Sequence, residues 1–248
     1  MQEFFYNAAM EMSLEKILQR QGFGSRKLCR TLVVQGRVHA ENAVCTDPGR
    51  RFETDAFHFS VDGQQWLYRE HLYLVLNKPA GFECSHQPQH HSSVFTLLPM
   101  QFIQRGLQCV GRLDQDTTGL LLLSDDGDFI HRYTSPKKKV PKVYDISTNA
   151  EIDELQIEKL KNGVQLKDET AITKALSCES FAECRMRLVI TEGKYHQVKR
   201  MVAAAGNRVE KLHRSAIGGL VLDDSLPSGQ WRYLDDNDLK KLNGPTGL

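Results

Sequence analysis

One short segment combines two carboxylates, two hydroxyls and two glycines: Gly111-Arg112-Leu113-Asp114-Gln115-Asp116-Thr117-Thr118-Gly119-Leu120-Leu121. It runs into the leucines Leu120–Leu123, which predict a buried strand. Loops at strand ends on a rigid sheet often carry catalytic groups. The residue types alone leave three roles open for Asp114 and Asp116: a paired general acid and base, a cation site, or ordinary turn residues, the simplest of the three.

Positive charge is concentrated locally, although the formal net charge of the chain is only +1. No acidic residue lies between Phe129 and Tyr144, a stretch whose basic residues are Arg132, Lys137, Lys138, Lys139 and Lys142. A second basic group lies near the start of the chain: Arg20, Arg26, Lys27, Arg30 and Arg37. Because phosphate binding depends on local charge, both groups are candidates for RNA contact. The alternative for the stretch from Arg132 to Lys142 is a mobile charged loop, and the alternative for the group near the start of the chain is a solvated helix face.

The composition argues against several classes of protein. No apolar stretch approaches the ~20 residues that span a bilayer, so no membrane association is expected. The segment Met1–Glu11 lacks the basic start and apolar core of a secretion signal, so a cytoplasmic protein is expected. The six cysteines form no Cys-x-x-Cys pair, which argues against a zinc ribbon and a disulfide framework. The histidines His86, His90 and His91 lack an acidic or thiol partner at ligand spacing, so no metal site is expected.

Two short helices followed by strands are predicted over residues 12–70. Leu14, Ile17 and Leu18 have helical spacing, and Ser25 is a candidate N-cap for a second helix that carries Leu28, Leu32 and Val33. After that helix the chain has the alternation and turn residues of strands. The sequence therefore predicts a small ααβ module, preceded by an extension over residues 1–11 that is a candidate for disorder.

A second domain, rich in strands, is predicted over residues 71–248. The strand candidates are Leu72–Asn77, Leu120–Ser124, Val143–Thr148 and Met186–Thr191. The clearest helix begins near Val198 and ends at Ala205, where Gly206 supplies a C-terminal cap. Because strands and helices do not alternate strictly, the pattern favours an α+β fold with a mainly antiparallel sheet.

The segment Gly111–Leu120 resembles the signature loop of pseudouridine synthases of the small-subunit type, the RsuA family. In that family the first aspartate is the essential carboxylate, which implies that Asp114 is catalytic. In this reaction the N1–C1′ bond of uridine breaks and a C5–C1′ bond forms, which needs a nucleophile and no redox step. The resemblance therefore implies no metal and no organic cofactor. Attack at C1′, attack on the ring and proton removal remain open, and Asp116 is expected to stabilise the loop.

Two further motifs carry the same resemblance. Lys142-Val143-Tyr144 matches the strand whose aromatic residue stacks on the target uracil, which implies this role for Tyr144. The segment Glu192–Met201 matches the motif whose basic residue pairs with the catalytic aspartate, which is Lys199 here and an arginine in many relatives. Arg112 is implied to fill the space left by the flipped base or to hold a phosphate. The alternative for Tyr144 is an ordinary half-buried tyrosine of a strand. The alternative for Lys199 is a solvated helix end.

The first module resembles an S4 RNA-binding domain in Gly24-Ser25-Arg26-Lys27, in the helix that follows, and in Gly36-Arg37-Val38. The segments Asn162–Leu166 and Thr173-Lys174 and the short C-terminus resemble the small-subunit branch. The implied substrate is 16S ribosomal RNA in a small-subunit assembly intermediate. The enzyme is expected to be a monomer. The alternatives are a 23S RNA uridine, a non-catalytic RNA-binding assembly factor, and a carboxylate-based hydrolase.

Overall fold

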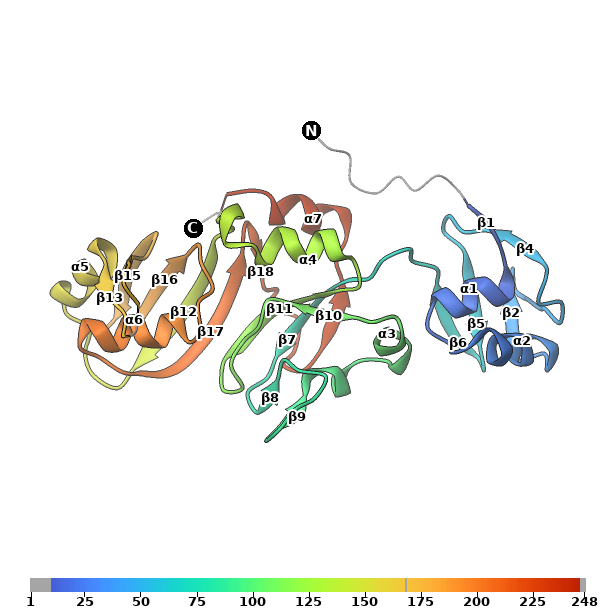
Figure 1. Cartoon of the computed structure of the whole chain (residues 1–248), viewed down its shortest axis with the longest axis horizontal. Coiled ribbons are helices and arrows are strands. Elements are labelled where there is room, and N and C mark those ends of the chain that lie inside the picture. Colours follow the sequence, from blue (N-terminus) through green and yellow to red (C-terminus); the bar gives the residue numbers. More distant parts are fainter. Residues whose placement is uncertain (1–9, 168, 246–248) are drawn as a thin grey trace. The chain divides into compact units, whose positions relative to one another are not determined.

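The computed structural model describes residues 10–167 and 169–245, which form two compact units (Figure 1). One unit runs to Leu72 and also includes Leu98–Leu107, and the other comprises Tyr73–Leu97 and the chain from Gln108 onward. Most of the predicted extension lies outside the described residues. Glu11, its last residue, belongs to a strand and pairs with Glu53.

The first unit contains the two predicted helices and a small antiparallel sheet. Its elements are β1 (Glu11–Ser13), α1 (Leu14–Arg20), α2 (Arg26–Val34), β2 (Val38–Ala40), β3 (Ala43–Val44), β4 (Arg51–Glu53), β5 (His58–Val61), β6 (Gln64–Leu67) and α3 (Met100–Gln104). The sheet has the order β3-β2-β5-β6, and β1 pairs with β4. The Ser25 side chain accepts a hydrogen bond from the Leu28 amide, which confirms the predicted N-cap.

The packed face of α2 differs in one position from the predicted pattern. Leu32 and Val33 are buried in the core of the first unit together with Ile17 and Leu18 of α1. Leu28, which the spacing assigns to the same face, is 49% exposed. It lies in the first turn of α2, where Cys29 rather than Leu28 is buried, so the helical period alone misplaces the start of the buried stripe.

The second unit is built on a nine-stranded sheet of order β15-β16-β12-β17-β11-β7-β19, with β10 beside β11 and β18 beside β17. These strands are β7 (Tyr73–Lys78), β10 (Gln108–Val110), β11 (Thr118–Ser124), β12 (Lys142–Thr148), β15 (Ser177–Ala182), β16 (Arg185–Ile190), β17 (Val209–Ile217), β18 (Leu220–Val221) and β19 (Trp231–Tyr233). Strands β11 and β17 run parallel, and the other neighbouring strands run antiparallel. The predicted α+β class with a mainly antiparallel sheet is confirmed.

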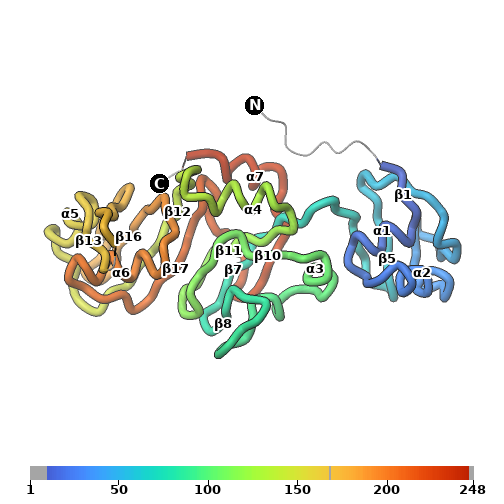
Figure 2. The backbone as a smooth tube through the Cα atoms, in the orientation of Figure 1, coloured from blue at the N-terminus to red at the C-terminus, as the bar shows by residue number. Residues whose placement is uncertain are grey.

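Helices pack on this sheet (Figure 2), and four short strands form two separate pairs outside it. The helices are α4 (Gly127–Thr134), α5 (Glu154–Asn162), α6 (Gln197–Ala205) and α7 (Asp236–Leu242), with the 3-10 turns η1 (Val94–Leu97) and η2 (Pro136–Lys138). The paired short strands are β8 (Phe82–Glu83) with β9 (Ser92–Ser93), and β13 (Val164–Gln165) with β14 (Ile172–Thr173). Gly206 ends α6 in the left-handed conformation, as predicted.

The centre of the sheet is buried on both faces. Leu120 and Leu122 of β11 pack with Phe129 of α4 and Leu242 of α7. Leu121, whose side chain points to the opposite face, is also fully buried. A strand covered on both sides is a rigid support for the loop that precedes it. Within the described residues, no helix combines the length and apolar character needed to cross a membrane.

Candidate active site

The loop that carries Asp114 joins β10 to β11 and is tied down by a buried lysine. Lys78, at the end of β7, is fully buried, and its Nζ donates hydrogen bonds to the carbonyls of Pro79 (3.0 Å), Gln115 (3.1 Å) and Thr117 (2.9 Å). Burial lowers the pKa of Lys78 below its usual range. Three carbonyl dipoles solvate this ammonium group, so the Lys78 side chain fixes the backbone on the C-terminal side of Asp114.

The loop ends in a close contact between two strands. Gly119 has a φ of +102°, and a β-carbon there would lie 2.4 Å from the carbonyl oxygen of Arg214 on β17. A side chain at this position would push β11 and β17 apart. The requirement for glycine in the signature loop therefore follows from the parallel pairing of these two strands.

Asp114 lies between the side chains of His196, which immediately precedes α6, and Lys199, in the first turn of α6. Lys199 Nζ is 3.1 Å from Asp114 Oδ2, and His196 Nε2 is 3.3 Å from Asp114 Oδ1. Lys199 Nζ also lies 2.6 Å from Asp116 Oδ1, so one ammonium group bridges both carboxylates of the loop. Burial lowers the pKa of Lys199, but the hydrogen bonds that Lys199 donates to both aspartates outweigh burial and raise its pKa overall. Burial raises the pKa of Asp116. The contact with Lys199 outweighs burial, so the pKa of Asp116 is lowered overall.

His196 reaches Asp114 from an unusual backbone conformation. Its φ of 48° and ψ of 31° are left-handed, a region that costs a non-glycine residue roughly 1 kcal/mol or more. Its imidazole stacks on the ring of Tyr195, with 3.8 Å between ring centroids and 20° between planes. Because His196 immediately precedes α6, this bend turns its imidazole back toward the Asp114 loop.

Tyr144 lies on β12 and is 7% exposed. It is directly opposite Arg214 of β17 in the antiparallel register, so the two side chains share one face of the sheet. Arg214 is also buried, and its Nε donates a 2.8 Å hydrogen bond to the carbonyl of Leu120. Tyr144, Arg214 and Asp114 all line one cavity.

That cavity has a volume of about 1040 Å³ and lies entirely in the second unit. Its walls include the loop Gly111–Thr117, Lys142 and Tyr144 of β12, and the segment Ile190–Lys199. The volume exceeds that of most small-ligand pockets, which suits a polymer substrate that inserts one residue. The structure thus brings together the three motifs that the sequence singled out.

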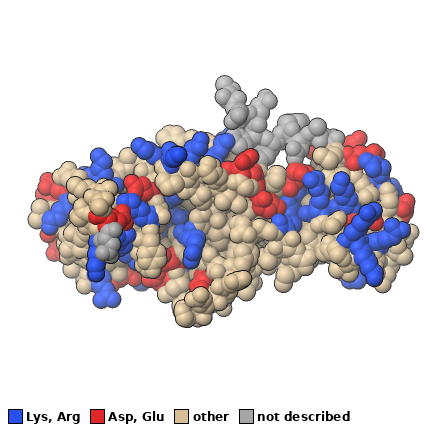
Figure 3. Space-filling model, viewed as in Figure 1, with Lys and Arg blue, Asp and Glu red and all other residues tan. Residues whose placement is uncertain are grey.

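Two of the basic residues predicted to contact RNA line this cavity, namely Arg112 and Lys142. Lys142 is half-buried, and its Nζ donates a 3.0 Å hydrogen bond to the carbonyl of Val140. Burial, and secondarily the charge of Arg214, lower the pKa of Lys142 to about 8. Basic side chains also gather over the region of α4 and η2 (Figure 3). This stretch carries Arg132, which is half-buried, and the exposed residues Lys137, Lys138 and Lys139.

The first-unit residues predicted to contact RNA are exposed, and several are paired with acids. Arg26 and Arg30 lie 2.7 Å and 3.6 Å from the carboxylate of the buried Glu15. Arg37 forms a 2.6 Å ion pair with Asp62, and Lys27 is exposed on α2. The side chains of Arg26 and Arg30 remain mostly exposed, at 74% and 64%, so both can approach a phosphate without leaving Glu15.

Sequence reasoning assigned no role to Lys78, His196 or Arg214. Lys78 does carry a signal, because it is a basic residue at the end of an apolar strand, where a buried charge is costly unless it is paired. Arg214 carries none, since its strand also contains Glu210, Lys211 and His213. His196 is inside the third motif, but nothing in that motif indicates a left-handed backbone.

The comparisons with known proteins establish the family. The model of the RNA pseudouridylate synthase family matches residues 72–204, and that of the S4 domain matches residues 12–56. An uncharacterized RNA pseudouridine synthase of Bacillus subtilis (strain 168) is 37% identical over 237 residues, which cover 94% of this chain and 99% of that protein. The chain belongs to the RNA pseudouridylate synthase family and carries an N-terminal S4 domain, as its motifs predicted.

Two further relatives agree with this assignment. Ribosomal small subunit pseudouridine synthase A of Vibrio parahaemolyticus serotype O3:K6 (strain RIMD 2210633) is 40% identical over 213 residues, 85% of this chain and 88% of that protein. A crystal structure of a pseudouridylate synthase matches with a TM-score of 0.66 at 32% identity, covering 93% of this chain and 99% of that chain. The protein is therefore an isomerase that converts uridine to pseudouridine in RNA.

Proposed function

We propose that this enzyme isomerises one uridine of 16S ribosomal RNA, with Asp114 as the catalytic carboxylate. The observation that carries the proposal is the contact of Asp114 with Lys199 inside the cavity that Tyr144 also lines. The name of the Vibrio relative supports the small-subunit substrate. We also propose that the enzyme binds this RNA within a small-subunit assembly intermediate in the cytoplasm, and that it acts as a monomer.

The reaction leaves the composition of the RNA unchanged. The N1–C1′ bond of the target uridine breaks, the uracil turns in the cavity, and a C5–C1′ bond forms. The proton leaves C5 and a proton is bound at N1, so neither an oxidant nor a reductant takes part. Asp114 acts on C1′, on the ring, or on a proton of the sugar, and each of these roles requires an ionised carboxylate. The ammonium group of Lys199 lies 3.1 Å from Oδ2 of this carboxylate and holds it in place in the cavity.

Tyr144 and Arg112 act on the flipped uracil and on the RNA around it. The uracil loses its stacking neighbours when it leaves the RNA, and the buried ring of Tyr144 offers a new aromatic partner. Arg112 lies beside Asp114 on the cavity wall, where it fills the space left by the base or holds a phosphate.

The remaining basic residues contribute affinity rather than sequence choice. Lys142 and the stretch from Arg132 to Lys139 bind the phosphate backbone next to the cavity. Arg26, Lys27, Arg30 and Arg37 do the same on the S4 domain. The preference for one uridine then comes from the shape of the folded RNA.

The test is pseudouridine mapping of ribosomal RNA in cells with and without the gene, complemented by the wild-type protein or by Asp114→Asn. We expect one 16S pseudouridine to disappear with the gene and to return only with the wild-type protein. Loss of a 23S pseudouridine instead would contradict the substrate. Loss of none would favour a non-catalytic assembly factor.

A further inference from the structure

Tyr195 is the most exposed of the large hydrophobic side chains of the structure's described part, with 77% of its surface accessible. A single exposed aromatic ring is common on protein surfaces and by itself indicates nothing. Tyr195 differs in its position, because it lines the cavity that contains Asp114 and lies next to His196, which contacts Asp114. Its ring is therefore at the rim of the catalytic cavity.

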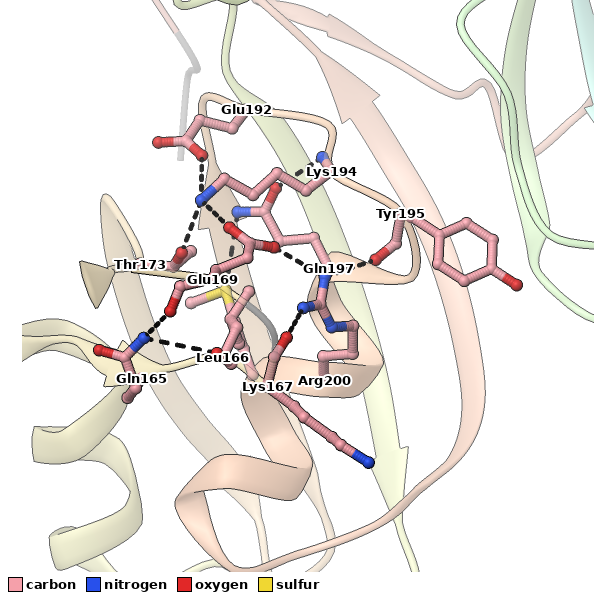
Figure 4. A network of polar contacts seen from close by, with 11 residues as sticks. Gln165, Leu166, Lys167, Glu169, Thr173, Glu192, Lys194, Tyr195, Gln197 and Arg200 are labelled. Atoms are coloured by element: carbon pink, nitrogen blue, oxygen red, sulfur yellow. Dashed lines mark hydrogen bonds and ion pairs between the residues drawn. The ribbon is translucent and has the colours of Figure 1, made fainter. Parts of the chain in front are cut away.

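A network of ion pairs braces the backbone that carries this ring (Figure 4). Arg200 Nη1 donates to the carbonyl of Tyr195 (3.2 Å) and to Glu169 Oε1 (2.8 Å). Lys194 Nζ contacts the same Glu169 at 2.6 Å and Thr173 Oγ1 at 2.9 Å. One carboxylate thus links the residue before Tyr195 to the helix after it.

The ring itself points away from this network (Figure 4). One side of the Tyr195 ring stacks on the imidazole of His196, with 3.8 Å between centroids and 20° between planes. The high exposure of the side chain leaves the other side accessible. The result is an aromatic surface held in one orientation at the rim of the cavity, with little conformational freedom left to lose on binding.

We propose that Tyr195 stacks on the base of a nucleotide adjacent to the target uridine. This inference deepens the proposed function, since it names a second contact of the same RNA substrate. Flipping the uridine into the cavity deprives the neighbouring base of its stacking partner. An aromatic ring at the rim replaces that partner, and such stacking tolerates any base because every base has a π face. Tyr144 receives the uracil inside the cavity, and Tyr195 receives its neighbour outside.

A fluorescence measurement tests the contact directly. The probe is a 16S RNA fragment that keeps the fold around the mapped pseudouridine, in which 2-aminopurine replaces the base before or after the target uridine. Stacking quenches 2-aminopurine. We expect the wild-type enzyme and Tyr195→Phe to quench the probe at one of the two positions, and Tyr195→Ala and Tyr195→Leu to leave it bright. Tyr195→Ala should also weaken binding by about 5- to 150-fold, the range expected for one base–aromatic stack.

A matched control is Phe181→Ala. Phe181 is another exposed ring of the same domain, 51% accessible on β15, and it does not line the cavity. This variant should quench and bind as the wild-type enzyme does. Equal quenching by wild type and Tyr195→Ala at both positions would overturn the inference.

Removing the base instead of the ring separates stacking from a structural role of Tyr195. An abasic nucleotide at the quenched position should weaken binding by the wild-type enzyme and should not weaken binding by Tyr195→Ala any further. Equal losses in both enzymes would contradict the contact. Because quenching and affinity are read without turnover, a Tyr195-dependent quench on RNA that the enzyme leaves unmodified would support the stacking contact while refuting the proposed reaction.

Discussion

The ammonium group of Lys78 donates a 2.9 Å hydrogen bond to the backbone carbonyl of Thr117, inside the loop that carries Asp114. Lys78 is fully buried, so Lys78→Met leaves three carbonyls without this donor while it removes a buried charge. Losing one partner of a buried polar cluster costs about 3 kcal/mol. We expect a melting temperature lower by roughly 6–12 °C, since about 1 kcal/mol shifts a domain of this size by about 2–4 °C. Calorimetry measures the shift, and an unchanged melting temperature would refute the tethering role.

Lys199 is expected to act through its contact with Asp114. Lys199→Ala removes an ionic hydrogen bond of about 1.5–3 kcal/mol, so kcat should fall by about 10- to 100-fold. Lys199→Arg keeps the charge and should retain more activity than the alanine variant. The matched control is Asp116→Asn, which removes the other carboxylate bound by Lys199 and should change kcat by only a few-fold. Full activity of Lys199→Ala in single-turnover assays would contradict the assigned role.

Lys142 predicts a pH dependence of RNA affinity. Its pKa of about 8 means that the folded enzyme loses this charge as the pH rises from about 7 to about 9. Affinity for 16S RNA should fall over this range in the wild-type protein. Lys142→Arg stays charged and Lys142→Met is neutral throughout, so both variants should show a flatter profile. Filter binding at constant salt measures it, and identical slopes in all three proteins would show that Lys142 does not contact the RNA.

The same group affects stability with the opposite sign. Between pH 8 and the ordinary lysine pKa of 10.5, Lys142 is mostly neutral in the folded protein and charged in the unfolded chain. The unfolded state then binds more protons, so the Lys142 contribution to the free energy of unfolding rises with pH across this window. Denaturant unfolding isolates this contribution as a difference: the free energy of unfolding of the wild-type protein relative to Lys142→Met should rise across this window. A difference that stays constant with pH would contradict the lowered pKa of Lys142.

Tyr144 should act through its ring. Tyr144→Phe keeps the stacking surface and should retain activity within a few-fold. Tyr144→Leu keeps an apolar side chain at this buried position but removes the aromatic face, so it should lower kcat/KM by about 5- to 150-fold, the range for one lost stack. Steady-state kinetics on 16S RNA measure both variants. Complete inactivity of Tyr144→Phe would assign the role to the hydroxyl instead.

Features set by neighbouring residues were predictable from the sequence. The Ser25 cap and the Gly206 cap depend on contacts within a few residues, and both are present as predicted. The buried strand from Thr118 to Ser124 was likewise visible in its run of leucines. Asp114, Tyr144 and Lys199 came from family resemblance, because their residue types alone also fitted turn, strand and helix-end roles.

Features set by distant contacts were not predictable. The parallel pairing of β11 with β17 places Arg214 beside Gly119, and no local pattern indicates it. The segment Leu98–Leu107 is grouped with the first unit although it interrupts the second in sequence. The three hydrogen bonds of Lys78 and the left-handed backbone of His196 likewise depend on tertiary structure.

The most direct test of the account is proton release by purified Asp114→Asn. Formation of the C5–C1′ bond expels the C5 proton, so tritium release from 16S RNA labelled at C5 of uridine reports the reaction itself. We expect the wild-type enzyme to release tritium, and Asp114→Asn to release none while it binds the RNA with an affinity within about twofold of wild type, because the asparagine is nearly isosteric. Tritium release by Asp114→Asn at the wild-type rate would contradict the central role of this carboxylate.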